Sequence, residues 1–82
     1  MHKLQIMGRE GHRELTWDPD KVGQGDPETL AVIAEAEQIL TEALARGHAA
    51  FRVDAPDQPA QRIEHFDQTA PVTVIVPRLA GG

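Results

Sequence analysis

The residues of this chain best suited to chemistry are Gly81 and Gly82, which close the sequence shortly after the apolar run 72–76. Glycine has no Cβ, so two in succession make a thin segment that can enter a narrow channel and present a carboxylate to another enzyme. A frayed chain end is the alternative interpretation, because the last residues of many domains are poorly ordered. Two final glycines arise by chance in roughly 0.5% of chains, so the residues before them decide how much the pair means.

The composition argues against a self-contained enzyme. The chain contains no Cys, Ser, Asn or Tyr. Without cysteine it has no disulfide, no thiolate nucleophile and no cysteine metal site, and without serine the usual hydroxyl nucleophile is missing as well. A chain of 82 residues forms one small domain with a modest core, in which a deep substrate cavity is not expected. We therefore expect a protein that is not an enzyme and has no cofactor of its own.

Charge and hydropathy narrow the choice of partners and compartment. The formal net charge is −5 and the eight basic residues are scattered, whereas nucleic-acid binding requires a clustered basic surface. No stretch approaches the roughly 18 apolar residues of a membrane-spanning helix. Residues 1–5 lack the apolar core of a signal peptide. We expect a monomer in the cytoplasm that binds neither nucleic acid nor membrane.

Two short runs of alternating apolar residues predict a β-hairpin at the start of the chain. Residues 2–7 and 12–17 form the predicted strands, and glycines between them supply the turn. Trp17 ends the second run, and we interpret it as a core anchor rather than a ligand platform. The segment 18–25 is expected to be an irregular connection. Its acidic residues are better explained by capping and turns than by a calcium loop, because the EF-hand spacing is missing.

A long amphipathic helix over residues 27–46 is the clearest element of the sequence. Asp26 can cap the first free amides, and Pro27 fits the first helical position. Apolar residues then recur with a period of 3.6, on a face centred near Ile33 and Leu40. This face predicts the surface by which the helix packs on a sheet.

Gly47 follows the predicted helix and is suited to the left-handed backbone that terminates it. Three further strands are expected after this residue. The pattern indicates strands at 49–53, 62–66 and 72–76, with the proline-containing loop 54–61 between the first two. The last strand is apolar at nearly every position, as expected of one flanked by other strands and covered by a helix. The whole order of elements predicts an α+β fold with one mixed sheet.

This order of elements resembles the β-grasp fold of ubiquitin and its relatives. In that family the first and last strands lie side by side in the centre of the sheet, and the helix packs across one face. The resemblance implies a ubiquitin-like domain over residues 1–77 with the order ββαβ(β)β, followed by a flexible tail over residues 78–82.

The tail carries the more specific resemblance. Arg78-Leu79-Ala80-Gly81-Gly82 resembles the Arg-Leu-x-Gly-Gly ending of mature ubiquitin. With the preceding proline it is also similar to the Pro-x-apolar-Ala-Gly-Gly ending of the small sulfur carriers for molybdopterin and thiamine synthesis. The body of the chain departs from both branches, so a protein modifier and a sulfur carrier remain alternative interpretations.

The resemblance implies that the chain is a substrate of other enzymes. An activating enzyme would use ATP to adenylate the Gly82 carboxylate, and a thiol or sulfide would attack the mixed anhydride. A thioester then passes to a lysine amine as an isopeptide bond, whereas a thiocarboxylate delivers sulfur. Gly81, which has no side chain, would let the tail pass through a narrow channel of the activating enzyme. That enzyme would bind Arg78, Leu79 and Ala80. Acceptor and deconjugating proteins are the other implied partners.

A second class of function remains open, because a β-grasp domain can serve as a non-conjugated interaction or adaptor module. If the valines of 72–76 point inward, Ile75 points outward as part of an apolar partner-binding patch, unless the proline-rich loop covers it. Arg13, Arg52 and Arg62 could converge on the outer sheet face and bind an acidic partner, although solvated strand faces are the default. The four histidines lack zinc-motif spacing and are expected on the surface.

Overall fold

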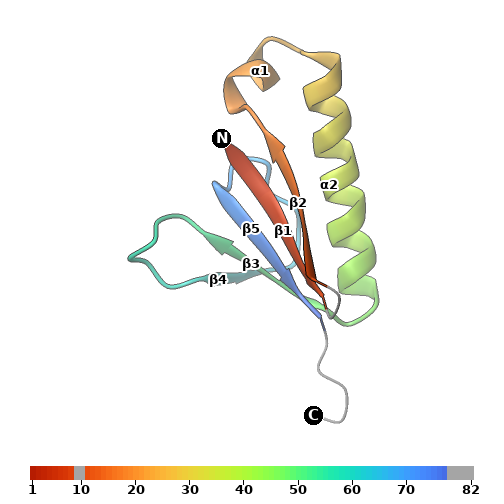
Figure 1. Cartoon of the computed structure of the whole chain (residues 1–82), viewed down its shortest axis with the longest axis vertical. Helices are drawn as coiled ribbons and strands as arrows, with labels where there is room; N and C mark the ends of the chain where they lie inside the picture. The colour runs from red at the N-terminus through yellow and green to blue at the C-terminus, as the bar shows by residue number, and fades with distance from the viewer. Residues whose placement is uncertain (9–10, 78–82) are drawn as a thin grey trace.

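The computed structural model describes residues 1–8 and 11–77, which form an α+β fold. Its elements in chain order are β1 (His2–Gly8), β2 (Gly11–Trp17), α1 (Pro19–Gly23), α2 (Pro27–Ala45), β3 (Ala49–Val53), β4 (Gln61–Ile63) and β5 (Val72–Val76). Within this described part five strands form one mixed sheet, and the long helix α2 lies along one face of it (Figure 1). The predicted order of the strands and the main helix is confirmed.

The first and last strands of the chain lie side by side in the middle of the sheet. The strand order is β2-β1-β5-β3-β4. β1 runs parallel to β5, and the other neighbouring strands are antiparallel. In the parallel pair Leu4 is opposite Thr73, and Ile6 is opposite Ile75. Because β5 has a strand on each side, a run that is apolar at nearly every position suits it.

The edge strand β4 is shorter than the sequence predicts. It spans 61–63 rather than 62–66, because pairing with β3 extends only from Gln61 to Ile63. Phe66 then leaves the edge of the sheet and packs against Trp17, with 6.0 Å between the ring centroids. Phe66, which the alternating pattern includes in the strand, thus packs in a tertiary contact instead.

The helix α2 begins and ends at its predicted capping residues. The Asp26 carboxylate accepts hydrogen bonds from the Thr29 N–H at 3.0 Å and from the Thr29 hydroxyl at 2.6 Å. At the other end Gly47 has a φ of 87°. This left-handed backbone lets the His48 N–H donate to the Ala43 carbonyl at 2.9 Å, which closes the helix in a Schellman motif.

The segment 18–25 is not the irregular connection that the sequence predicts, because it contains the five-residue helix α1. The Asp18 carboxylate caps this helix by accepting from the Asp20 N–H at 2.9 Å, and a proline takes the first helical position. At its end the Asp26 N–H donates to the Lys21 carbonyl at 3.1 Å. The cap of α2 is therefore joined directly to the last turn of α1.

The hydrophobic core lies between α2 and the sheet face that this helix covers. Trp17 is only 3% exposed and is confirmed as a core anchor. Ile33 and Leu40 form the buried face of α2, as the period of the sequence predicts. The buried members of the core cluster are Leu4, Trp17, Ile33, Ala36, Leu40, Ala43, Ala50 and Ile75.

Candidate functional site

The residues that the sequence predicts to be activated or gripped lie outside the described residues; they are Arg78, Leu79, Ala80, Gly81 and Gly82. The structure does describe the strand from which they follow. β5 pairs with β1 on one side and with β3 on the other, and Pro77 comes directly after it. The chain thus leaves the centre of the sheet at the end of the molecule where α2 also ends (Figure 1).

Ile75 belongs to the core, and its expected exposure as a partner-binding residue is wrong. Its side chain is fully buried. The register places Ile75 between Ile6 of β1 and Ala50 of β3, on the face that α2 covers. Because successive side chains of a strand point to opposite faces, the three valines of β5 lie on the other side of the sheet.

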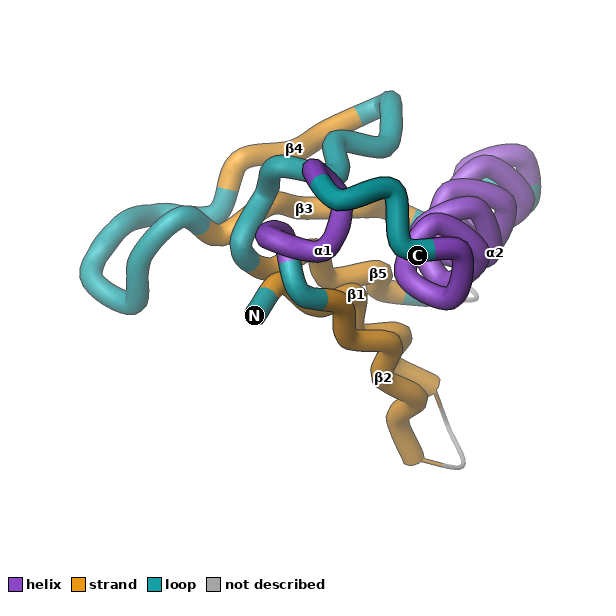
Figure 2. Tube along the Cα trace, turned by 90° about the horizontal axis from the view of Figure 1, so that it is seen from above, coloured by secondary structure: helices purple, strands orange, loops and turns teal. Residues whose placement is uncertain are grey.

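Those valines are the centre of an apolar surface that we call the uncovered sheet face. It consists of Met7, Phe51, Val53, Val72, Val74 and Val76, which share this face by alternation and register. Within the described residues no helix covers it, since α2 lies on the opposite side of the sheet (Figure 2). Met7 is 44% exposed and Val76 is 37% exposed, and the other four side chains are half-buried.

Polar side chains frame the uncovered sheet face. Lys3 and Arg62 share the face by their register with β5 and β3. Toward the β2 edge the Gln5 side-chain amide donates to the Glu14 carboxylate at 3.1 Å. An apolar centre within a polar rim is typical of surfaces that bind other proteins. The arrangement suits docking of a partner near the point where the chain leaves β5.

Sequence reasoning missed this surface, although a signal for it exists. β3 alternates between the larger Phe51 and Val53 and the smaller or charged Ala50 and Arg52. On that pattern alone the larger pair is expected in the core. Ala50 instead belongs to the core cluster, together with Leu40 and other residues of α2. A small residue opposite a long helix was the available clue, because a helix packed closely on a sheet favours small side chains beneath it.

The three arginines considered as a docking site for an acidic partner do not converge. Arg13 lies on the helix side of the sheet, where its guanidinium is 2.8 Å from the Glu35 carboxylate. Arg52 is also on the helix side and contacts Asp67 at 2.7 Å. Only Arg62 lies on the uncovered sheet face. The register of the strands therefore places Arg13 and Arg52 on one face of the sheet and Arg62 on the other.

An ion-pair network fixes the loop that leads into β5. The Arg52 guanidinium lies 2.7 Å from both the Asp54 and the Asp67 carboxylates. Asp67 also accepts from the Thr69 hydroxyl at 2.6 Å and from the Thr69 N–H at 2.9 Å. These Thr69 hydrogen bonds, and then the charge of Arg52, lower the pKa of Asp67 below its ordinary value of 3.8. The hydrogen bond to Asp54 is the largest cause of the raised pKa of Arg52.

The histidines are divided between exposed and half-buried positions. His12 and His65 are exposed, whereas His2 and His48 are half-buried, and the His2 ring meets Trp17 edge-on at 6.3 Å between centroids. In residues 1–8 and 11–77 no cluster of three or more His, Cys, Asp or Glu side chains is placed to hold a metal ion. No described helix is long and apolar enough to cross a bilayer.

Comparisons with protein-family models, with curated proteins and with solved structures found no match to this chain.

Proposed function

We propose that this chain is a ubiquitin-like β-grasp protein whose Gly82 carboxylate is adenylated by an activating enzyme. The observation that carries the proposal is the position of β5. This strand is central in the sheet and parallel to β1, and the sequence Arg78-Leu79-Ala80-Gly81-Gly82 begins two residues after it ends. A reactive carboxylate is then tethered to a strand that is paired on both sides.

The architecture supports the β-grasp assignment at three points. The first and last strands are neighbours in the centre of a mixed sheet, one long helix covers a single face, and the strand order is β2-β1-β5-β3-β4. The resemblance to the ubiquitin family implies the first two of these features. Fold does not fix function, so the tail sequence carries the choice of chemistry.

The proposed chemistry takes place on the chain but is catalysed by other proteins. The Gly82 carboxylate attacks the α-phosphate of ATP, an acyl-adenylate forms and pyrophosphate leaves. A thiolate or a sulfide equivalent then attacks the acyl carbon and AMP leaves. The thioester passes to a lysine amine with release of the thiol, which forms an isopeptide bond. A thiocarboxylate instead carries sulfur to an acceptor. Gly81 gives the tail its narrow profile in both routes.

In this proposal the uncovered sheet face docks the activating enzyme. Val76 is the exposed end of that face and precedes the tail by a single residue, Pro77. A partner bound to the valines of β5 would therefore also receive the tail. Arg78, Leu79 and Ala80 would be gripped along the channel that leads to the ATP site.

The test uses the chain prepared to end at Gly82, together with ATP and an adenylating enzyme from the same cell. ATP–pyrophosphate exchange measures formation of the acyl-adenylate, and the expected result is exchange that depends on the chain. A sulfide donor is then added and the intact mass is recorded. Replacement of one oxygen by sulfur indicates a sulfur carrier, and a lysine-linked adduct on another protein indicates a modifier.

Two variants control this experiment. Removal of Gly81 and Gly82 is expected to abolish exchange without altering the fold, because both residues lie beyond β5. The substitution Glu37→Gln, on the exposed side of α2, is expected to leave exchange unchanged. Exchange that survives loss of both glycines contradicts the proposal.

The uncovered sheet face also favours a second candidate function, a non-conjugated interaction or adaptor module. An apolar face with a polar rim can bind a partner without any reaction at the tail. This candidate predicts that a partner captured by the intact chain is bound with equal affinity after deletion of residues 78–82. The first proposal predicts that the deletion abolishes all adducts and ATP-dependent products.

A further inference from the structure

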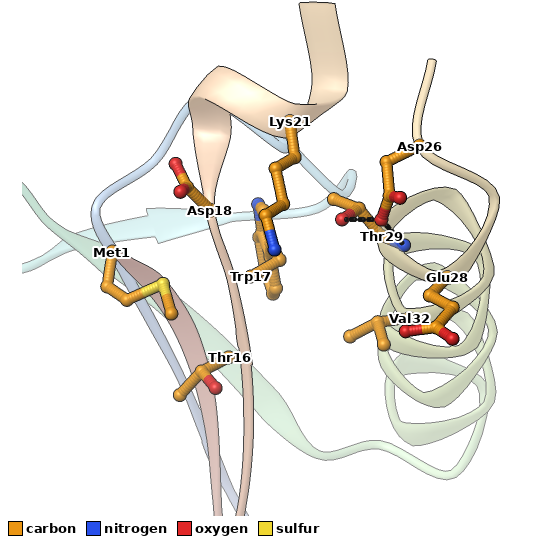
Figure 3. A pocket seen from close by; sticks show the side chains of 9 residues that line it. All are labelled: Met1, Thr16, Trp17, Asp18, Lys21, Asp26, Glu28, Thr29 and Val32. Carbon is orange, nitrogen blue, oxygen red and sulfur yellow. Dashed lines mark hydrogen bonds between the residues drawn. The ribbon is translucent and has the colours of Figure 1, made fainter. Parts of the chain in front are cut away.

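A small pocket lies at the end of the molecule opposite the point where β5 ends. It has a volume of about 190 Å³ and is bounded by the end of β2, by α1 and by the first turns of α2 (Figure 3). Figure 1 shows α1 and the start of α2 at one end of the long axis and the end of β5 at the other. The pocket is therefore independent of the proposed chemistry at the tail.

The indole of Trp17 forms the back of this pocket. Trp17 is 3% exposed, and its Nε1–H donates to no acceptor within the described residues. A buried donor without an acceptor is costly and is uncommon in folded proteins. Trp17 lines the pocket but its Nε1 is itself covered, so a ligand there could supply the missing acceptor once a covering side chain moves aside.

The walls of the pocket carry an excess of negative charge. Three carboxylates line it, from Asp18, Asp26 and Glu28, and among the described residues Lys21 is the only lining residue with a basic side chain. Asp26 and Asp18 are fixed by their roles as helix caps. The Glu28 carboxylate makes no hydrogen bond or ion pair with another described residue. The pocket is thus suited to a cation and repels an anion.

Lys21 places a positively charged side chain beside these carboxylates. It is held at the pocket because the Asp26 N–H donates to its carbonyl at 3.1 Å, and its positive charge contributes to the lowered pKa of Asp26, after the two Thr29 hydrogen bonds. In the view of Figure 3 the Lys21 side chain passes in front of the Trp17 indole. An ammonium group can balance the carboxylates, but it has no lone pair to accept the indole N–H.

We propose that this pocket binds a lysine or arginine side chain of a partner protein, which displaces Lys21. The incoming cation takes the place of the Lys21 ammonium, which forms no ion pair within 4.0 Å with any described carboxylate. A backbone carbonyl of the same incoming residue accepts the hydrogen bond from Trp17 Nε1. A basic residue in a peptide supplies both groups at once, whereas Lys21 supplies only the charge. The three carboxylates line the pocket without converging on one point, since no group of three such side chains in the described residues is placed to hold a metal ion.

The test uses the single tryptophan of the chain, whose indole N–H gives one isolated NMR signal. The protein is titrated with N-acetyl-arginine methylamide and, in parallel, with N-acetyl-citrulline methylamide, which has the same shape without the charge. The arginine amide is expected to bind weakly and to shift the indole signal in a saturable manner. The citrulline amide is expected to leave the signal in place. An equal response to both compounds overturns the proposal.

Three variants sharpen the result. Lys21→Ala removes the competing cation and is expected to tighten binding of the arginine amide by about fivefold. Glu28→Gln is expected to weaken binding by about fivefold, whereas Glu37→Gln, an exposed glutamate farther along α2, serves as the matched control and leaves it unchanged. If Lys21→Ala binds no more tightly, or if both glutamate variants weaken binding equally, the proposed site is wrong. Far-ultraviolet circular dichroism verifies that each variant is folded.

Discussion

Ile75 and Val76 are adjacent in β5 but lie on opposite faces of the sheet, so that Ile75 is fully buried whereas Val76 is 37% exposed. Ile75 packs in the core beneath α2, and Val76 belongs to the uncovered sheet face. One face of β5 therefore contributes side chains to the core, and its other face contributes side chains to the surface. The two residues are expected to respond differently to the same substitution.

Ile75→Ala is expected to lower the free energy of unfolding by about 2–5 kcal/mol, because it leaves a cavity among fully buried side chains. Val76→Ala is expected to lower it by less than about 1 kcal/mol, since part of that side chain already meets water. Urea unfolding followed by circular dichroism measures both. Equal losses would show that the two faces of β5 are not divided as described.

Val76→Glu tests the proposal that the uncovered sheet face docks an activating enzyme. A charge at the exposed end of that face is expected to raise the KM for the chain in pyrophosphate exchange by about tenfold, with kcat little changed. Thr41→Glu, on the exposed side of α2, is the matched control and is expected to change neither. An unchanged KM for Val76→Glu would place the docking surface elsewhere.

Thr73→Val is expected to stabilise the protein by about 1 kcal/mol. The Thr73 hydroxyl is buried and has no hydrogen-bond partner within the described residues, so a methyl group of similar shape removes an unpaired polar atom. Thr69→Val is the contrasting variant. It removes the hydroxyl that donates to Asp67 at 2.6 Å, and a loss of about 1 kcal/mol is expected. Thermal unfolding of the two variants should shift in opposite directions.

Stability is expected to fall on acidification below about pH 4. Thr69 and Arg52 lower the pKa of folded Asp67, and Thr29 and Lys21 lower that of folded Asp26, in both cases below the ordinary value of 3.8. The unfolded chain therefore binds more protons in this range than the folded protein does. The contribution of these carboxylates is complete above their ordinary pKa and is lost as the pH falls through the lower folded value.

Urea unfolding at a series of pH values checks this dependence. Asp67→Asn is expected to lower stability at neutral pH and to flatten the acid slope. Asp57→Asn is the matched control, because Asp57 is exposed and makes no hydrogen bond or ion pair with another described residue. An acid slope that Asp67→Asn leaves unaltered would contradict the assignment.

The elements with strong local signals were predictable from the sequence. Asp26, Pro27 and Gly47 mark the ends of α2 through backbone chemistry that needs no tertiary contact. The helix α1 was missed because five residues carry too little periodicity to stand out. The two faces of β5 could not be assigned, because apolar residues occupy both. The register with Ile6 and Ala50 shows that Ile75 points toward the helix.

The candidate site was predictable to a smaller extent. The tail was found as a sequence motif, whereas the uncovered sheet face required the sheet register and the side on which α2 packs. The pocket at Trp17 depends on the turn between α1 and α2, which brings Lys21 and Asp26 together. Such surfaces arise from elements that are distant or weakly marked in sequence, so no local pattern reveals them.

The placement of β5 between β1 and β3 has a consequence for biosynthesis. A nascent chain that stops before residue 72 has an empty slot in the middle of its sheet, with two unsatisfied strand edges facing one another. The sheet is therefore complete only after β5 has left the ribosome. Products that stop before β5 expose those two strand edges to proteases.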